Sequence, residues 1–124
     1  MELAQIKKSI HEFRGMKVML DMDLARMYEV ETRVLKQSVR RNSERFPPDF
    51  MFELSKDEWA DLRSQIVILE SGRGKHAKYL PFAFSDQGVA MLSAILNSKK
   101  ALEMSIQIMR AFVHMRQWAL SHED

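Results

Sequence analysis

Two short helices joined by a tight turn are predicted for residues 21–45, and this unit constrains the fold more than any other stretch. Asp21 stands directly before an apolar run with helical spacing, where its carboxylate can cap free backbone amides. Residues 29–31 leave room only for a turn, and Thr32 can cap the second helix. A double proline at 47–48 stops that helix. The pattern is typical of a helix-turn-helix.

The second helix is predicted to be amphipathic, with a basic outer face. At about 100° per residue, small and apolar side chains such as Leu35 and Val39 fall on one side. Four of the six residues on the other side are cationic: Arg33, Lys36, Gln37, Arg40, Arg41 and Glu44. Arginine and glutamine can read base edges in the major groove of DNA, whereas lysine suits phosphate. A purely solvated face is the alternative interpretation.

Length and composition favour one small α+β domain over residues 1–124, with its core in 10–118. The net charge of +2 is small, so any electrostatic argument depends on where the charges lie. The absence of cysteine excludes disulfides and thiolate metal sites, which fits a cytoplasmic protein. No apolar run approaches the roughly 20 residues of a membrane span.

The first half of the chain is predicted to contain a β-hairpin and a strand. Residues 1–8 are expected to form at most a partial turn, and residues 9–20 a hairpin that turns at Arg14 and Gly15. A short strand follows at 49–54. A helix then runs from Ser55 to about residue 64, with Glu58 completing a capping box.

A second hairpin with a basic tip, a wing, is predicted around residues 72–78. The strand-like segments 66–69 and 78–84 flank a glycine-containing basic stretch. In this interpretation Arg73, Lys75 and Lys78 contact phosphate or the minor groove. A polar loop without such a role is the alternative.

Two helices are predicted at the end of the chain, over 86–96 and 99–120. In the last helix the predicted core stripe is Leu102, Ile106, Met109, Phe112 and Val113, and further apolar residues, Met104, Ile108, Met115 and Trp118, broaden it. A helix this apolar either covers the domain core or pairs with a second copy. We therefore expect a homodimer through this helix.

No catalytic, metal or cofactor site is predicted, so we expect neither an enzyme nor a small-molecule substrate. The four histidines are far apart, and no phosphate-binding glycine loop or Gly-x-Ser-x-Gly motif occurs. Asp21 and Asp23 could hold a divalent ion together with Glu53 or Asp57, but helix capping explains both aspartates without a metal.

Four segments together resemble a known family: VMLDMDLA, RFPPDFMF, LRSQ and FSDQGVAMLS. Over about residues 13–116 the chain resembles the ORF-six-N-terminal branch of the KilA-N DNA-binding domains of phages and prophages. The resemblance implies an α+β DNA-binding domain of a regulatory, antirepressor-like protein. It differs at Glu29, where the family often has glycine, and at Pro48, which replaces a commoner polar residue.

The sequence thus predicts sequence-specific binding of double-stranded DNA, through the helix-turn-helix at 21–45 and the basic wing near 72–78. The alternative function is a protein-interaction module that captures a repressor or another regulator. An apolar patch left exposed on the last helix would favour that alternative.

Overall fold

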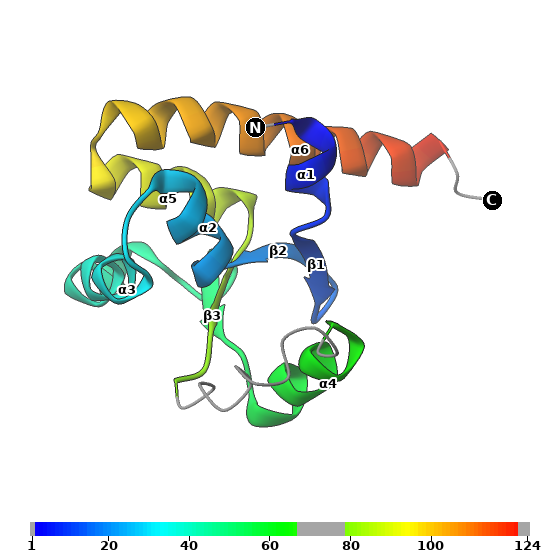
Figure 1. Ribbon diagram of the computed structural model, residues 1–124, viewed down its shortest axis with the longest axis horizontal. Coiled ribbons are helices and arrows are strands. Elements are labelled where there is room, and N and C mark those ends of the chain that lie inside the picture. The colour runs from blue at the N-terminus through cyan, green and yellow to red at the C-terminus, as the bar shows by residue number, and fades with distance from the viewer. Residues whose placement is uncertain (1, 67–78, 122–124) are drawn as a thin grey trace.

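The computed structural model describes residues 2–66 and 79–121 and has the predicted α+β architecture (Figure 1). The helices are α1 (Leu3–Lys7), α2 (Asp21–Tyr28), α3 (Thr32–Arg41), α4 (Lys56–Ile66), α5 (Asp86–Leu96) and α6 (Lys99–Ser121). The strands are β1 (Ile10–Phe13), β2 (Met16–Leu20), β3 (Met51–Glu53) and β4 (Phe82–Phe84). A 3-10 turn (Ser43–Arg45) follows α3.

The described strands form one antiparallel sheet in the order β1-β2-β4-β3. The predicted N-terminal hairpin is confirmed, with Phe13 opposite Met16. Arg14 and Gly15 both have positive φ angles, 56° and 78°. Two consecutive positive φ angles give the turn whose twist matches that of paired strands. This turn fixes the register of the hairpin.

The second predicted hairpin would pair residues 66–69 with residues 78–84. In the described sheet β4 pairs instead with β2 and β3. Strand β4 lies between β2 and β3, so Phe84 is opposite both Met19 and Met51. Ile66, predicted to begin a strand, is instead the last residue of α4, because the capped helix continues through it. The basic tip with Arg73, Lys75 and Lys78 lies outside the described residues.

The helices of the second half begin as predicted, because each has a local start signal. Glu58 accepts a hydrogen bond from the Ser55 amide (2.7 Å) and its own amide donates to the Ser55 hydroxyl (3.1 Å). Before α5, the Ser85 hydroxyl accepts from the Gly88 amide (3.3 Å). Asn97, with a φ of 48°, ends α5 in the left-handed region that asparagine tolerates.

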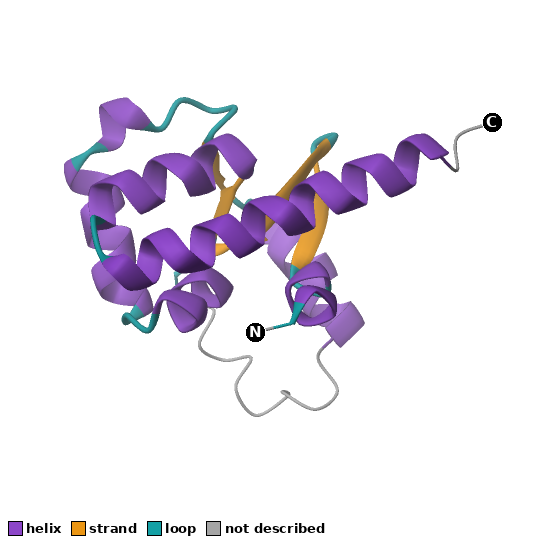
Figure 2. Cartoon of the chain, turned by 90° about the horizontal axis from the view of Figure 1, so that it is seen from above, coloured by secondary structure: helices purple, strands orange, loops and turns teal. Residues whose placement is uncertain are grey.

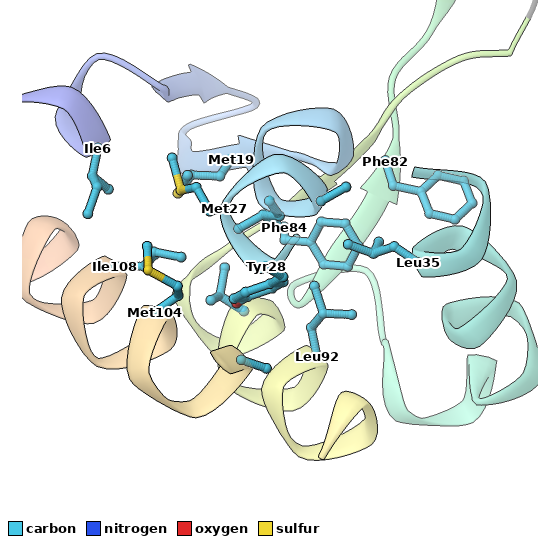
Figure 3. Packing of buried hydrophobic residues seen from close by; sticks show 14 of the residues in the cluster. Ile6, Met19, Met27, Tyr28, Leu35, Phe82, Phe84, Leu92, Met104 and Ile108 are labelled. Atoms are coloured by element: carbon cyan, nitrogen blue, oxygen red, sulfur yellow. The ribbon is translucent and has the colours of Figure 1, made fainter. Parts of the chain in front are cut away.

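The sheet is covered by helices on both faces, and alternation along the strands supplies both cores. Val18 and Leu20 of β2 face the side covered by α4. Met19 points to the other side, where α2, α5 and α6 lie (Figure 1). Figure 3 shows Phe84 of β4 at the centre of this larger core, among Tyr28, Leu92 and Leu35. Alternating side chains are expected for a sheet with two covered faces.

The prediction for residues 1–8 is wrong, because Leu3–Lys7 form the short helix α1. Ile6 of this helix is completely buried, and α1 packs against α6. A five-residue helix is not stable by itself, so the contact with α6 stabilises it. Leu3, Ala4 and Ile6 lie within little more than one helical turn, and so short a segment gives no periodic signal that could have predicted this contact.

The face of α6 that packs on the domain also differs from the prediction. Leu102, Ile106 and Val113, predicted to face the core, are 58%, 46% and 46% exposed. The buried face carries Ala101, Met104, Ser105, Ile108, Ala111 and Phe112. Because apolar residues surround much of this helix, periodicity alone left two possible inner faces, and packing against α1, α2 and α5 decides between them.

An ion pair joins the hairpin turn to α4 and gives a pH-dependent prediction. Arg14 donates two hydrogen bonds of 2.9 Å to Glu58, and with the Ser55 amide they lower the pKa of Glu58 to about 2. A carboxylate with a lowered pKa contributes stability above its ordinary pKa and loses it as the pH falls towards 2. We expect Arg14→Asn, which suits a turn with positive φ, to raise the pKa of Glu58.

Titration of the Glu58 side-chain carboxyl by carbon NMR measures this change. Lys17→Ala is the control, because Lys17 pairs with Glu12 (3.4 Å) and does not contact Glu58. A pKa of Glu58 that is unchanged in Arg14→Asn would contradict the role assigned to Arg14.

Candidate nucleic-acid interface

Helices α2 and α3 pack together and are joined by a three-residue turn, as predicted for a helix-turn-helix. Leu24 and Tyr28 of α2, and Leu35 and Val39 of α3, are buried at 3% exposure or less. The Tyr28 hydroxyl also lies 2.9 Å from the Ser105 hydroxyl of α6. The two-helix unit is therefore held firmly by the domain core.

Asp21 and Thr32 do not cap these helices, contrary to the prediction. Each is the first residue of its helix, and Leu20 and Glu31 occupy the cap positions without side-chain cap bonds. The Asp21 carboxylate instead accepts a hydrogen bond from the backbone amide of Phe82 (2.9 Å). Asp21 therefore attaches β4 to the start of α2, a contact between residues distant in sequence.

Lys36 is buried, so the prediction that it faces outward on α3 is wrong. Its ammonium group donates to the carbonyl of Leu80 (2.9 Å), lies 3.5 Å from Asp21 and stands 4.5 Å from the centre of the Phe82 ring. Burial raises the pKa of Asp21, while the Phe82 amide and Lys36 act in the opposite direction. Lys36 and Asp21 together hold the chain before β4 against α3, so Lys36 has a structural role.

The other four predicted residues of α3 lie together on its exposed side. They are Arg33, Gln37, Arg40 and Arg41. Arg33 pairs with Glu31 (2.8 Å), and the Arg40 guanidinium lies 5.4 Å from the centre of the Phe82 ring. Helix α3 contains no acidic residue. Its exposed face is therefore positively charged and can attract phosphate.

A groove of about 620 Å³ runs beside this face. Its lining residues come from α2, α3 and the segment before β4: Asp21, Met22, Thr32, Arg33, Lys36, Arg40, Tyr79 and Pro81. Tyr79 is 68% exposed and was not among the DNA-contacting residues predicted from the sequence. Its position after the basic stretch and two residues before a strand-breaking proline was the available signal.

Comparison with protein-family models shows a match to the ORF6N domain over residues 8–95. The chain belongs to the ORF6N family. The match includes every strand of the sheet and all of α2 and α3. The groove and the buried pair of Asp21 and Lys36 therefore lie within the ORF6N part of the chain. No curated protein and no solved structure matched.

The turn of this ORF6N domain places a non-glycine residue in a strained conformation. Glu29 has φ 61° and ψ 44°, in the left-handed region. Its amide donates to Arg26 (3.2 Å), and the amide of Val30 donates to Ala25 (3.0 Å), which closes α2. These bonds require the left-handed residue, so a glycine fits this position without strain.

We expect Glu29→Gly to raise the free energy of unfolding by about 1 kcal/mol, because the strain at Cβ disappears. The lost ion pair with Lys100 (3.2 Å) is exposed, so it offsets only part of this gain. Urea denaturation of the two proteins measures the difference. Glu29→Ala is the control, since it loses the same carboxylate but keeps Cβ. If the glycine variant is no more stable than the alanine variant, the strain is negligible.

The described residues provide no group of ligands for the divalent ion that was weighed above, as an alternative, at Asp21 and Asp23. Among them, no three histidine or acidic side chains are grouped closely enough to hold an ion. Asp21 is buried and bonded to Phe82 and Lys36, while Asp23 pairs with Arg26 (3.1 Å). In the same part of the chain, no helix has the length and apolarity needed to cross a membrane.

Proposed function

We propose that this ORF6N domain binds double-stranded DNA in a sequence-specific manner, with α3 in the major groove. The observation that carries the proposal is the exposed face of α3, where Arg33, Gln37, Arg40 and Arg41 lie together without an acidic residue. The ten residues of α3 span about 15 Å, a length that fits the major groove. A second helix held by its partner is the element that helix-turn-helix proteins insert there.

The individual side chains suggest distinct roles in this complex. Arg40 and Gln37 lie in the middle of the exposed face, where they can form bidentate bonds with guanine and adenine. Arg33 and Tyr79 line the adjoining groove and are suited to the sugar-phosphate backbone. Lys36 makes no direct contact in this proposal. With Asp21 it fixes the chain that carries Tyr79.

The family relation supports a regulatory role. The chain resembles KilA-N domains of phage and prophage regulators, and the ORF6N match covers the proposed interface. We infer that the protein regulates transcription in a phage or prophage setting, with DNA as the partner of α3.

Fluorescence anisotropy with a randomised pool of duplexes at about 100 mM salt tests the proposal. We expect binding that weakens steeply as salt increases, because cationic side chains release counterions from phosphate. Selection from the pool should enrich a defined sequence. Absence of binding, or binding that is insensitive to salt, would refute DNA recognition by this face.

The predicted wing gives a separate test, although its basic residues lie outside the described part of the chain. Neutralising Arg73, Lys75 and Lys78 together is expected to weaken binding to all duplexes alike. If each contacts one phosphate, the slope of log affinity against log salt should fall by about 3. Salt titrations of the parent and the triple variant measure this slope. A triple variant that binds like the parent would exclude the wing from the interface.

One observation favours the second candidate function, capture of another regulator. Leu102, Ile106 and Val113 of α6 form the exposed apolar surface that this function requires. A domain that binds no duplex but retains a phage or host regulator in a pull-down would support capture. The same surface also fits a second copy of this chain.

A further inference from the structure

An apolar stripe runs along the outer side of α6. It consists of Leu102, Ile106, Met109 and Val113, and we call it the outer stripe. Three of these residues are at least 46% exposed, and Met109 is partly buried at the edge of the larger core. An apolar groove of about 500 Å³ lies along it and also includes Leu3 of α1. In Figure 2, α6 crosses in front of the other helices, so its outer side is open within the described protomer.

The outer stripe has the spacing of a coiled-coil seam. Its residues follow one another at intervals of four, three and four, which is the alternating spacing of the a and d positions of a heptad repeat. Helix α6 has 23 residues and is about 34 Å long, and the outer stripe, from Leu102 to Val113, extends over somewhat less than two heptads of it. The spacing therefore fits a second helix better than a flat or irregular surface.

We propose that the outer stripe packs against the same stripe of a second copy, with the two α6 helices antiparallel. In this register Leu102 lies opposite Val113 of the second copy, and Ile106 lies opposite Met109. Two-fold symmetry repeats both contacts. The seam ends near Arg116, which is held on its own domain by Asp86 (2.7 Å).

Charge complementarity favours a second copy of this chain as the partner of the outer stripe, with the two α6 helices antiparallel. Glu103 and Arg110 are exposed and lie seven residues apart on the same side of the outer stripe. Among the described residues neither has an ion-pair partner within its own chain. In the antiparallel register Glu103 comes beside Arg110 of the second copy, and symmetry forms this pair twice.

A parallel arrangement lacks these pairs. The flanking positions that meet in a parallel coiled coil would join Ser105 to Arg110 and Phe112 to Gln117. Neither combination is an ion pair, and Ser105 and Phe112 are buried against their own domain. The antiparallel pair is therefore the arrangement that both charge and burial favour.

Self-association through α6 leaves the proposed DNA interface open. Helix α3 lies at the left edge of the body, below α5 and α2, whereas α6 runs along the top (Figure 1). Oligomeric state can therefore be tested without DNA, and a failure of DNA binding would not affect the result.

Sedimentation velocity of the 124-residue protein from about 1 to about 200 μM tests the proposal. We expect a monomer-dimer equilibrium in the parent and a monomer in Ile106→Glu, which buries a charge in the seam. Glu103→Arg and Arg110→Glu should each weaken self-association about tenfold, because like charges meet at both symmetric contacts. An equimolar mixture of these two variants should associate about as tightly as the parent, since opposite charges then meet at both contacts.

Thermal unfolding followed by circular dichroism confirms that each variant is folded. A parent protein that stays monomeric over the whole concentration range would overturn the proposal. The outer stripe would then favour binding of a different protein. A dimer that survives Ile106→Glu would place the interface elsewhere. A mixture that associates no better than either charge variant alone would overturn the antiparallel register.

Discussion

Replacing Arg40 and Arg41 with glutamate is expected to lower the affinity for the selected duplex at least about 100-fold. Both side chains are exposed on the face of α3 that we assign to DNA. A good base contact contributes about 1–3 kcal/mol of discrimination, and each 1.4 kcal/mol corresponds to a factor of ten. Reversal of charge removes two contacts and adds repulsion from phosphate. The sequence preference should change as well, because these residues lie where base edges would be.

A control with the same change in net charge separates local contacts from general electrostatics. Lys8 directly follows α1 and Lys56 begins α4, and both are exposed and away from the groove beside α3. Replacing both with glutamate should leave the sequence preference intact and reduce affinity much less. Circular dichroism should show both variants folded, since exposed substitutions usually change stability by about 0.5 kcal/mol or less. Equal losses in the two variants would mean that α3 does not read the sequence.

Gly88→Ala is expected to lower the free energy of unfolding by about 3 kcal/mol or more. A Cβ at this position would overlap the backbone carbonyl oxygen of Phe50 and lie 2.9 Å from its carbon. That oxygen already accepts hydrogen bonds from the Ser85 amide (3.0 Å) and hydroxyl (3.3 Å). The backbone must therefore move where β3 meets the start of α5. A loss of this size corresponds to a decrease in Tm of about 10 °C for a domain of this length.

Two arguments predict opposite signs for the change in the free energy of unfolding of Gly88→Ala, so the measurement distinguishes them. Helix propensity alone predicts that alanine in place of Gly88 stabilises α5 by about 1 kcal/mol. The close approach of Phe50 predicts the opposite. Ala90→Gly is the matched control, because Ala90 is exposed on the same helix. Its replacement by glycine should lower the free energy of unfolding by about 1 kcal/mol. Thermal and urea denaturation compare the three proteins, and a stabilised Gly88→Ala would refute the contact.

The sequence by itself determined the elements that have local signals. The turn at Arg14 and Gly15 requires positive φ angles, which places the first hairpin. The capping box of Ser55 and Glu58 and the cap at Ser85 define the starts of two helices. The apolar spacing in residues 21–45 predicted α2, the turn and α3. These signals depend on neighbours a few residues away, so they can be read without the fold.

Only the tertiary structure determined whether residues at the edge of a helix's apolar face are buried or exposed. Lys36 lies about 40° from exposed Arg40 and about 60° from buried Val39, so spacing leaves its environment open. The segment before β4 covers it, and Asp21 and Leu80 bind its charge.

The same reason applies to α6, where apolar residues occupy both candidate faces. Contacts with α1, α2 and α5 determine which face of α6 is buried, and most of the outer stripe stays exposed. Asp21 binds the Phe82 amide, which is distant in sequence, and Tyr79 lines a groove together with residues of α2 and α3. Burial and partners at long range are properties of the folded chain, because they depend on which elements meet and not on the spacing within any one of them.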